Sequence, residues 1–245
     1  MKITRTTVKR IDTKITFGKI KRLVALAMFA ALAYVIHFVH IPVGFLNLDF
    51  KDVIITICGM YFGPISGIII ALVVPLLEFI TVSSTGVYGL IMNILSSVTF
   101  VGTASVIYRF QKTLSGAIIG LLSAVFAMTA VMMAANLLVT PYYMGVSVAD
   151  IGALIPTLLL PFNAIKAILN ASLTLCLYKP LTSVLKRTGF KRKDIENVEN
   201  GYQEMSKNNT KNHLRIALVY VMGGSIAIAS LAIIFFVLGG SIALF

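Results

Sequence analysis

One lysine and several asparagines stand inside long apolar segments, where polar side chains are rare. Lys166 closes the stretch Pro161-Phe162-Asn163-Ala164-Ile165-Lys166, and Asn163 lies three residues earlier on the same helical face. A lysine within a membrane span costs about 3 kcal/mol on insertion scales, so such a residue usually faces a cavity or a partner. The alternative is that Lys166 extends its amine to the outer membrane interface.

Asn136 and Asn93 fall at similar depths, near the outer ends of their expected helices. Together with Asn163 and Lys166 they predict a pocket near the outer leaflet for a neutral molecule that forms hydrogen bonds. Each asparagine alone is equally compatible with a hydrogen bond between helices.

Two further features are expected near this pocket. The polar stretch Asn47-Leu48-Asp49-Phe50-Lys51-Asp52 is expected to cover it as a lid, or else to form a solvated turn. Tyr88, Tyr142 and Tyr143 are placed to stack on a planar ligand, although tyrosines at such positions also form interfacial aromatic belts.

The composition excludes a soluble monomer. The chain has 245 residues, of which 58% are apolar and 12% charged, with a mean hydropathy of +0.94. Ordinary globular proteins carry about 25% charged residues. The two cysteines, Cys58 and Cys176, lie inside apolar runs, which argues against a disulfide framework. The sequence therefore predicts an all-α, multi-pass membrane protein.

The net charge of +12 comes from basic clusters that flank the apolar runs. Eight basic residues lie in 1–22 and nine in 179–215, and Arg109 and Lys112 form a third cluster. This is the positive-inside pattern of a membrane protein with a cytoplasmic N-terminus, and it argues against nucleic-acid binding. The clusters are also suited to anionic lipid headgroups of the bilayer.

The apolar runs predict six helices at 23–39, 52–62, 65–80, 87–108, 114–139 and 151–178. Gly63-Pro64 splits the second run, a loop covers 140–150, and Lys179-Pro180 ends the sixth helix. A cleaved signal peptide is the competing interpretation of the first run, but no clear cleavage site follows it.

Four regions follow from this pattern. They are a basic cytoplasmic N-terminus at 1–22, a six-helix ligand-binding membrane domain at 23–180, a basic cytoplasmic linker at 181–213 and an additional transmembrane helix at 214–245. The chain has no phosphate-binding glycine loop, His-Glu-x-x-His motif or serine elbow, and its histidines have no metal-ligand spacing. We therefore expect a binding or permeation unit, not an enzyme, without its own energy source.

Several stretches together resemble a known family. They are Leu48-Asp49-Phe50, Gly86-Val87-Tyr88-Gly89-Leu90-Ile91-Met92-Asn93, Asn136, Pro141-Tyr142-Tyr143 and the stretch ending at Lys166. Over roughly residues 20–180 the chain resembles the riboflavin-specific S components of energy-coupling factor (ECF) transporters. The segment after residue 180 departs from that family's usual end.

The resemblance implies a subunit that captures riboflavin at the outer face, needs no cofactor, and topples in the membrane to release its ligand. Its partners would be a transmembrane coupling subunit and two ATPase subunits. The first helix would dock on the coupling subunit through Ala27 and Ala31, which have the spacing for close helix contact. The implied ligand-binding residues are Asn47, Leu48, Asp49, Phe50, Gly86, Tyr88, Asn93, Asn136, Asn163 and Lys166.

Other functions stay open at this point. FMN is a possible ligand because Lys166 could pair with a phosphate, and so is another planar vitamin. A membrane enzyme or assembly factor that handles flavin or lipid, and a purely structural membrane subunit, are alternatives from other classes.

Overall fold

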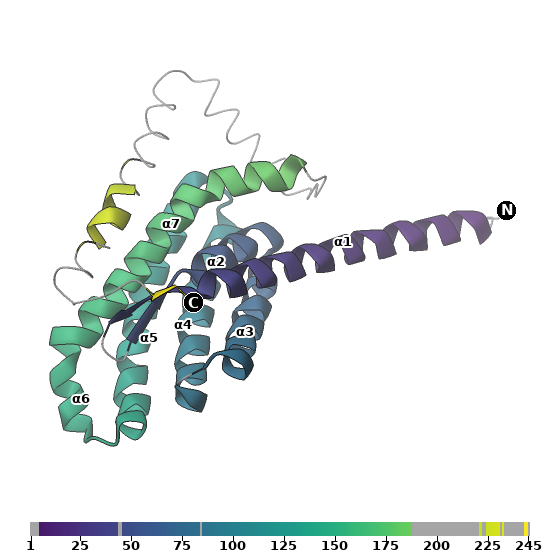
Figure 1. The fold of residues 1–245 in the computed structure, drawn as a ribbon. Helices are drawn as coiled ribbons and strands as arrows, with labels where there is room; N and C mark the ends of the chain where they lie inside the picture. Colours follow the sequence, from purple (N-terminus) through teal and green to yellow (C-terminus); the bar gives the residue numbers. More distant parts are fainter. Residues whose placement is uncertain are drawn as a thin grey trace.

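The computed structural model describes residues 5–43, 46–83, 85–187, 221, 224–230, 232 and 243–244. Helices that pack side by side form the body of the molecule, and α1 extends beyond it toward the N-terminus (Figure 1). The elements in chain order are α1 (Arg5–His37), β1 (Val39–Val43), β2 (Leu46–Asp49), α2 (Lys51–Phe62), α3 (Pro64–Thr81), α4 (Gly86–Phe110), α5 (Leu114–Met144), α6 (Val148–Leu154), η1 (Ile155–Leu159), α7 (Leu160–Arg187) and β3 (Ala243–Leu244).

Five helical segments of the described chain are long and apolar enough to cross a membrane. They are Ile20–His37, Pro64–Thr81, Gly86–Phe110, Leu114–Met144 and Val148–Pro180. Large apolar side chains such as Phe126, Leu138 and Leu23 point outward, each at least 68% exposed. An apolar exterior of this kind suits lipid and not water, which agrees with the expected multi-pass membrane protein.

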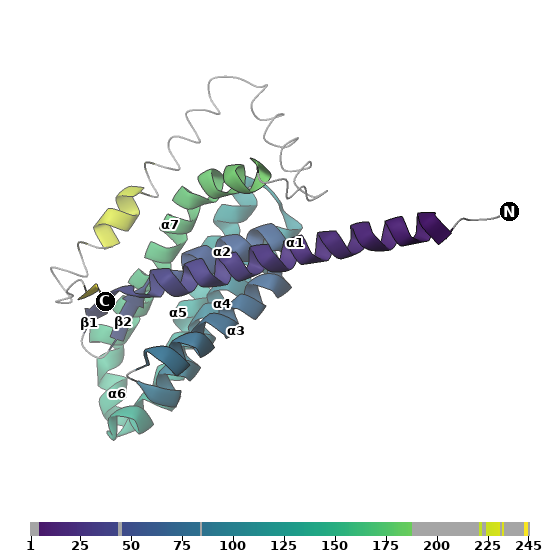
Figure 2. The same ribbon diagram turned by 45° about the vertical axis from the view of Figure 1, so that its right-hand side comes forward.

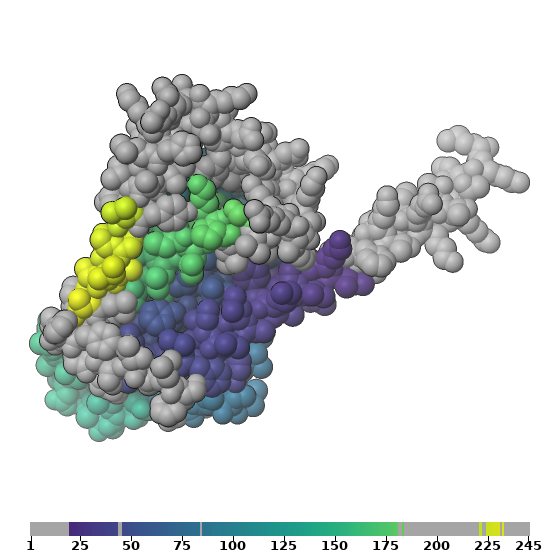
Figure 3. Space-filling model, turned by 45° about the horizontal axis from the view of Figure 1, so that its top comes forward, coloured from purple at the N-terminus to yellow at the C-terminus, as the bar shows by residue number. Residues whose placement is uncertain are grey.

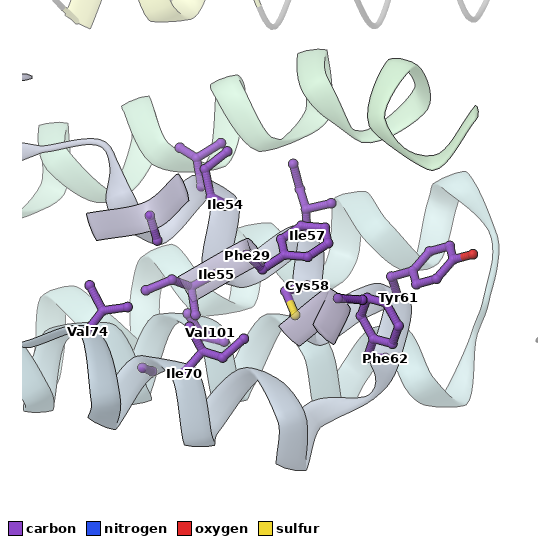
Figure 4. Close-up of a cluster of buried hydrophobic side chains, with 14 residues drawn as sticks. Phe29, Ile54, Ile55, Ile57, Cys58, Tyr61, Phe62, Ile70, Val74 and Val101 are labelled. Atoms are coloured by element: carbon purple, nitrogen blue, oxygen red, sulfur yellow. The ribbon is translucent and has the colours of Figure 1, made fainter. Parts of the chain in front are cut away.

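Helix α2 lies at the centre of the bundle, and all twelve of its residues are buried. It packs against α1, α3, α4 and α7. Figure 4 shows Ile55, Ile57 and Cys58 of α2 among Phe29 of α1, Ile70 of α3 and Val101 of α4. Other helices surround α2, and beyond its charged first turn it is mostly apolar around its circumference, as expected for a fully buried helix.

The turn between α2 and α3 confirms the split predicted at Gly63-Pro64. Gly63 adopts a φ of 101°, which favours glycine, and Pro64 begins α3, where its missing N–H costs no hydrogen bond. Arg22 of α1 reaches this turn and donates to the Phe62 carbonyl (3.2 Å) and the Ser66 hydroxyl (2.6 Å).

The segment after α1 is a β-hairpin, so the all-helical prediction was incomplete. β1 pairs with β2 with His40 opposite Asp49, and β3 adds antiparallel to the other edge of β1, giving the strand order β2-β1-β3. Leu48 of β2 and Ile41 of β1 are buried against Phe162 of α7. Alternate hairpin side chains thus anchor the strands on α7.

Several predicted helix limits were wrong. The first helix begins at Arg5 and ends at His37, where 23–39 was predicted. α5 continues through Pro141-Tyr142-Tyr143 and ends where Gly145 adopts a left-handed φ of 67°. The sixth predicted helix is divided by the π-helical turn η1, which contains Pro156 and its missing N–H donor. Its last part, α7, continues past Pro180 to Arg187, because one proline removes only one intrahelical hydrogen bond.

Parts of the N-terminal and C-terminal regions lie outside the described residues. These parts are 1–4 of the basic N-terminus, 188–213 of the linker and most of the additional helix expected at 214–245. Within the last region, residues 224–230 are helical. They run beside α7 in two views, coloured yellow (Figures 1 and 2), and the space-filling view places them against α7 (Figure 3).

Candidate functional site

A cavity of about 1050 Å³, including its open mouth, lies beside the hairpin. Its wall combines apolar side chains with a small number of polar ones, as small-molecule sites do. Its lining comes from α1, the hairpin, α3, the segment leading into α4, α4, α5 and α7: His37, Leu46, Asn47, Asp49, Pro75, Glu78, Phe79, Val82, Ser83, Thr85, Tyr88, Gly89, Leu90, Met92, Asn93, Ser96, Met132, Asn136, Val139, Thr140, Tyr143, Phe162, Asn163 and Lys166.

Lys166 joins α7 to the hairpin. Its Nζ donates to Asp49 Oδ2 at 3.3 Å and lies 3.5 Å from the backbone oxygen of Asn47. Lys166 is only 5% exposed and Asp49 2% exposed. The amine therefore faces the cavity and a buried partner instead of extending to the membrane interface, as the alternative interpretation would require.

The ion pair continues into a chain of buried charges. Lys51 lies 3.6 Å from Asp49 and 2.5 Å from Glu78 of α3. On its other side, Glu78 accepts a hydrogen bond from Asn93 (3.4 Å) and lies 3.2 Å from His37 Nδ1. Buried charges are tolerated only when paired, so this chain fixes α1, the hairpin, α2, α3 and α7 relative to one another.

Two opposing effects act on the carboxyl of Asp49. Its complete burial would raise the pKa, but the neighbouring ammonium groups of Lys166 and Lys51 outweigh burial and hold the pKa well below its usual value. Asp49 is therefore ionised throughout the physiological range.

Two buried amides stand near Lys166 on the cavity wall. Asn163 uses its amide nitrogen to donate to the Leu159 carbonyl of its own helix (2.7 Å). Asn136 of α5 donates to Met132 O (2.7 Å) and accepts from the Thr140 hydroxyl (2.9 Å). Each amide nitrogen carries a second hydrogen and each amide oxygen two lone pairs, so both side chains keep capacity for a ligand.

Aromatic side chains form a further part of the lining. The rings of Tyr88 and Tyr143 lie 6.2 Å apart between centroids, and Phe79 and Phe162 line the same cavity. Tyr142, in contrast, is 76% exposed and is absent from the lining. The cavity thus combines flat apolar surfaces with a few polar groups, as planar heterocycles need.

The residues expected from the sequence divide into two groups. Asn47, Asp49, Tyr88, Asn93, Asn136, Asn163 and Lys166 line the cavity. Leu48, Phe50 and Gly86 do not: Leu48 is fully buried under the hairpin, Phe50 packs beside it, and Gly86 begins α4 at a φ of 60°.

Sequence reasoning missed His37, Glu78, Ser96 and Thr140. Glu78 was not among the predicted pocket residues, but it is 3% exposed inside α3 and lines the cavity. A carboxylate within the apolar run 65–80 was the available signal, since an ionisable residue inside a membrane span marks a functional site. Ser96 and Thr140 gave no such signal, because hydroxyl residues are common in membrane helices.

The Asp49 pairs predict a pH-dependent stability. Asp49→Asn should destabilise the protein by roughly 3–5 kcal/mol at pH 7, because buried Lys166 loses its counter-ion and Lys51 keeps only Glu78. The pKa of Asp49 is lower in the folded protein than in the unfolded chain, where it is about 4. The ion pairs therefore stabilise the fold fully above about pH 4, and this stabilisation is lost as the pH falls from there toward the folded-state pKa.

Thermal unfolding in detergent at pH 7 and pH 3 measures this effect. We expect the gap in Tm between wild type and Asp49→Asn to narrow at pH 3. The exposed Asp150→Asn is the control and should show a much smaller gap at pH 7. An equal Asp49→Asn gap at both pH values would contradict the ion pairs.

Comparisons with known proteins agree with this site. Residues 21–178 match the family described as "ECF transporter, substrate-specific component". The riboflavin transporter RibU of Staphylococcus aureus (strain TCH60) is 35% identical over 184 residues, which cover 71% of this chain and 97% of that protein. The riboflavin transporter FmnP of Bacillus subtilis (strain 168) is 28% identical over 163 residues, 61% of this chain and 86% of that protein.

A solved S component of a bacterial ECF transporter superposes with a TM-score of 0.60 at 34% identity, covering 69% of this chain and 99% of that structure. The family match over residues 21–178 includes every residue that lines the cavity, from His37 to Lys166. The chain therefore belongs to the substrate-specific S components of ECF transporters, which are multi-pass membrane proteins and not enzymes.

Proposed function

We propose that this S component captures riboflavin from outside a bacterial cell. The observation that carries the proposal is the cavity in which Asn136, Asn163 and Lys166 meet aromatic side chains, in a chain 35% identical to a riboflavin transporter. The edge of a flavin ring alternates carbonyl oxygens with an N–H group. Amides offer both donors and acceptors to such an edge, and Lys166 adds a donor.

The charges of the lining favour riboflavin over FMN. Among the described residues, Lys166 is the only lysine or arginine that lines the cavity, and Asp49 neutralises it at 3.3 Å. Glu78 adds a further carboxyl to the wall. A phosphate group would find no unpaired cation there, and placing an unpaired anion in a buried site is costly.

The exposed face of α1 supports a docking role toward a coupling subunit. Ala27 and Ala31 are exposed one turn apart, whereas Ala25, Phe29 and Ala33 of the same helix are buried. Small side chains at this spacing allow another helix to approach closely. We place the N-terminus in the cytoplasm, and the partners would be the ECF coupling subunit with its two ATPase subunits.

The C-terminal region at 214–245 would act as an additional helix after α7 that completes the ligand-binding domain. Ala227 is 6% exposed in a cluster with Phe162 of α7 and Val43 of the hairpin. β3 pairs with β1, with Ala243 opposite His40. This pairing supplies hydrogen bonds to an edge of the hairpin that would otherwise be open, so the region would hold the strands that carry Asn47 and Asp49.

Absorbance of the purified protein tests the ligand. After expression in a flavin-containing host, the wild type should be yellow with a flavin spectrum. Lys166→Met and Asn163→Leu should weaken riboflavin binding roughly 10- to 100-fold, because each loses a buried hydrogen bond to the ligand. Lys179→Met, an exposed lysine on the same helix, is the matched control and should bind normally.

Fluorescence quenching titrations then separate the two flavins. FMN should bind the wild type more weakly than riboflavin. A colourless preparation that also fails to quench riboflavin fluorescence would overturn the flavin proposal, whereas equal binding of FMN would overturn only the charge argument.

Substitution on α1 tests the docking face. Ala27→Leu with Ala31→Leu should abolish uptake in cells that contain the coupling subunit and ATPases, while riboflavin binding in detergent stays within twofold. Ala153→Leu, at an exposed alanine of α6, is the control and should support uptake. Normal uptake by the double variant would remove this face from the coupling interface.

Hydrogen exchange of the hairpin amides tests whether the C-terminal region at 214–245 stabilises the hairpin. Deletion of residues 214–245, or Ala227→Leu in the buried cluster, should speed exchange of the amides of 39–49 at least several-fold, because β1 loses its partner. Ile228→Leu is the matched control, since Ile228 is 70% exposed. Unchanged exchange in both altered proteins would mean that the C-terminal region does not stabilise the hairpin.

A further inference from the structure

Four fully buried polar side chains lie between the helices and outside the lining of the cavity. Asp52 and Thr56 belong to α2, Ser97 to α4 and Asn170 to α7, and each is 0% exposed. The cavity lining includes none of the four. We call them the Asp52–Asn170 layer, and the riboflavin proposal gives them no role.

Their positions on the helices direct these side chains into one interior space. The Ser97 hydroxyl donates to Asp52 Oδ1 at 2.5 Å, which joins α4 to α2. Met60 follows Asp52 by two turns on the same face of α2, and it shares a buried cluster with Ala167 of α7. Asn170 comes three residues after Ala167, on the same side of that helix. Asp52 and Asn170 therefore both face the space between α2, α4 and α7.

Several polar atoms of the layer have no hydrogen-bond partner. Asp52 Oδ2 is buried and unpaired, and so are the amide oxygen and the amide nitrogen of Asn170. Buried polar groups in native proteins are nearly always satisfied, and an isolated buried carboxylate is especially costly. The unpaired oxygens of Asp52 and Asn170 thus indicate a bound species that interacts with both.

The buried charges of the described residues do not balance. Three carboxyl groups are buried, those of Asp49, Asp52 and Glu78, but only two ammonium groups, those of Lys51 and Lys166. The two lysines form ion pairs with Asp49 and Glu78, and neither forms one with Asp52. Asp49, Lys51 and Lys166 are the charged neighbours of Asp52. One positive charge is therefore missing, and Asp52 is the carboxylate without a partner.

The available ligand atoms are oxygens. Besides the carboxylate of Asp52 and the amide oxygen of Asn170, the layer offers two hydroxyl oxygens. Thr56 donates its hydrogen to the Asp52 backbone oxygen at 2.6 Å, so the lone pairs of its hydroxyl stay available. Carboxylate, amide and hydroxyl oxygens suit hard cations. A single excess negative charge matches a cation of charge +1.

We infer that the Asp52–Asn170 layer binds a small monovalent cation, such as sodium, between α2, α4 and α7. The cation neutralises Asp52 and joins three helices that surround the ligand cavity. This site is separate from the cavity, so the inference does not depend on which molecule the cavity binds.

Thermal unfolding of the purified protein in detergent tests the site. Tm is measured at pH 8 in sodium chloride and in choline chloride at equal concentration, since choline is too large for a buried site. Histidine is neutral at this pH, so His37 leaves the charge balance unchanged. The wild type should unfold about 5 °C higher in sodium chloride, because only the folded state binds the cation.

Four variants identify the ligands. Asp52→Asn and Asn170→Leu should lose the sodium effect on Tm. In choline chloride, Asp52→Asn should also unfold at a higher temperature than the wild type, because the excess charge is gone. Ser97→Ala should reduce the sodium effect at least twofold. Ser105→Ala is the matched control, a buried serine of α4 that donates only within its own helix, and it should keep the full effect.

Three results would overturn the inference. The first is an equal Tm of the wild type in both salts at pH 8. The second is a sodium effect that persists in Asp52→Asn, which would place the cation elsewhere. The third is a wild-type Tm that falls in both salts between pH 6 and pH 9 while that of Asp52→Asn stays constant, which would mean that a proton neutralises Asp52.

Discussion

The buried ion pair between Lys166 and Asp49 is the interaction on which the ligand site depends. It connects α7 to the hairpin at 3.3 Å and, through Lys51, continues to Glu78 of α3. An uncompensated charge at any of these positions would be expensive in a protein interior surrounded by lipid. The polar wall of the cavity is therefore preorganised before any ligand arrives, which lowers the entropy cost of binding.

The bundle has a closely packed part and a part that contains the cavity, and the chain of buried charges lies between them. Away from the cavity, the helices of the bundle pack closely. A Cβ on Gly67 of α3 would lie 2.7 Å from the Cα of Gly59 in α2, so these backbones approach as closely as glycine allows. The cavity interrupts the packing between α3, α4, α5 and α7. The close packing of α2 against α3 thus holds the helices in place around the cavity.

Much of this arrangement was predictable because membrane sequences carry strong signals. The apolar runs located the helices, Gly63-Pro64 located the break before α3, and the cost of a buried lysine marked Lys166. The hairpin was not predicted, because Val39–Val43 continues the apolar run of α1 and its alternation is short. Glu78 was missed because a carboxylate near a helix end looks the same in sequence whether it faces solvent or a buried lysine.

The short central helix has a consequence for how the protein enters the membrane. Twelve residues of α2 span only about 18 Å, well short of the roughly 30 Å hydrocarbon core. Its first turn carries Lys51 and Asp52, whose charges would be unpaired in lipid. α2 therefore cannot insert alone as the ribosome delivers it. Entry as a pair with α3 would remove one unpaired charge, because Glu78 of α3 is the partner of Lys51. Lys166 of α7 is made more than a hundred residues after Lys51 and completes the chain of charges through Asp49.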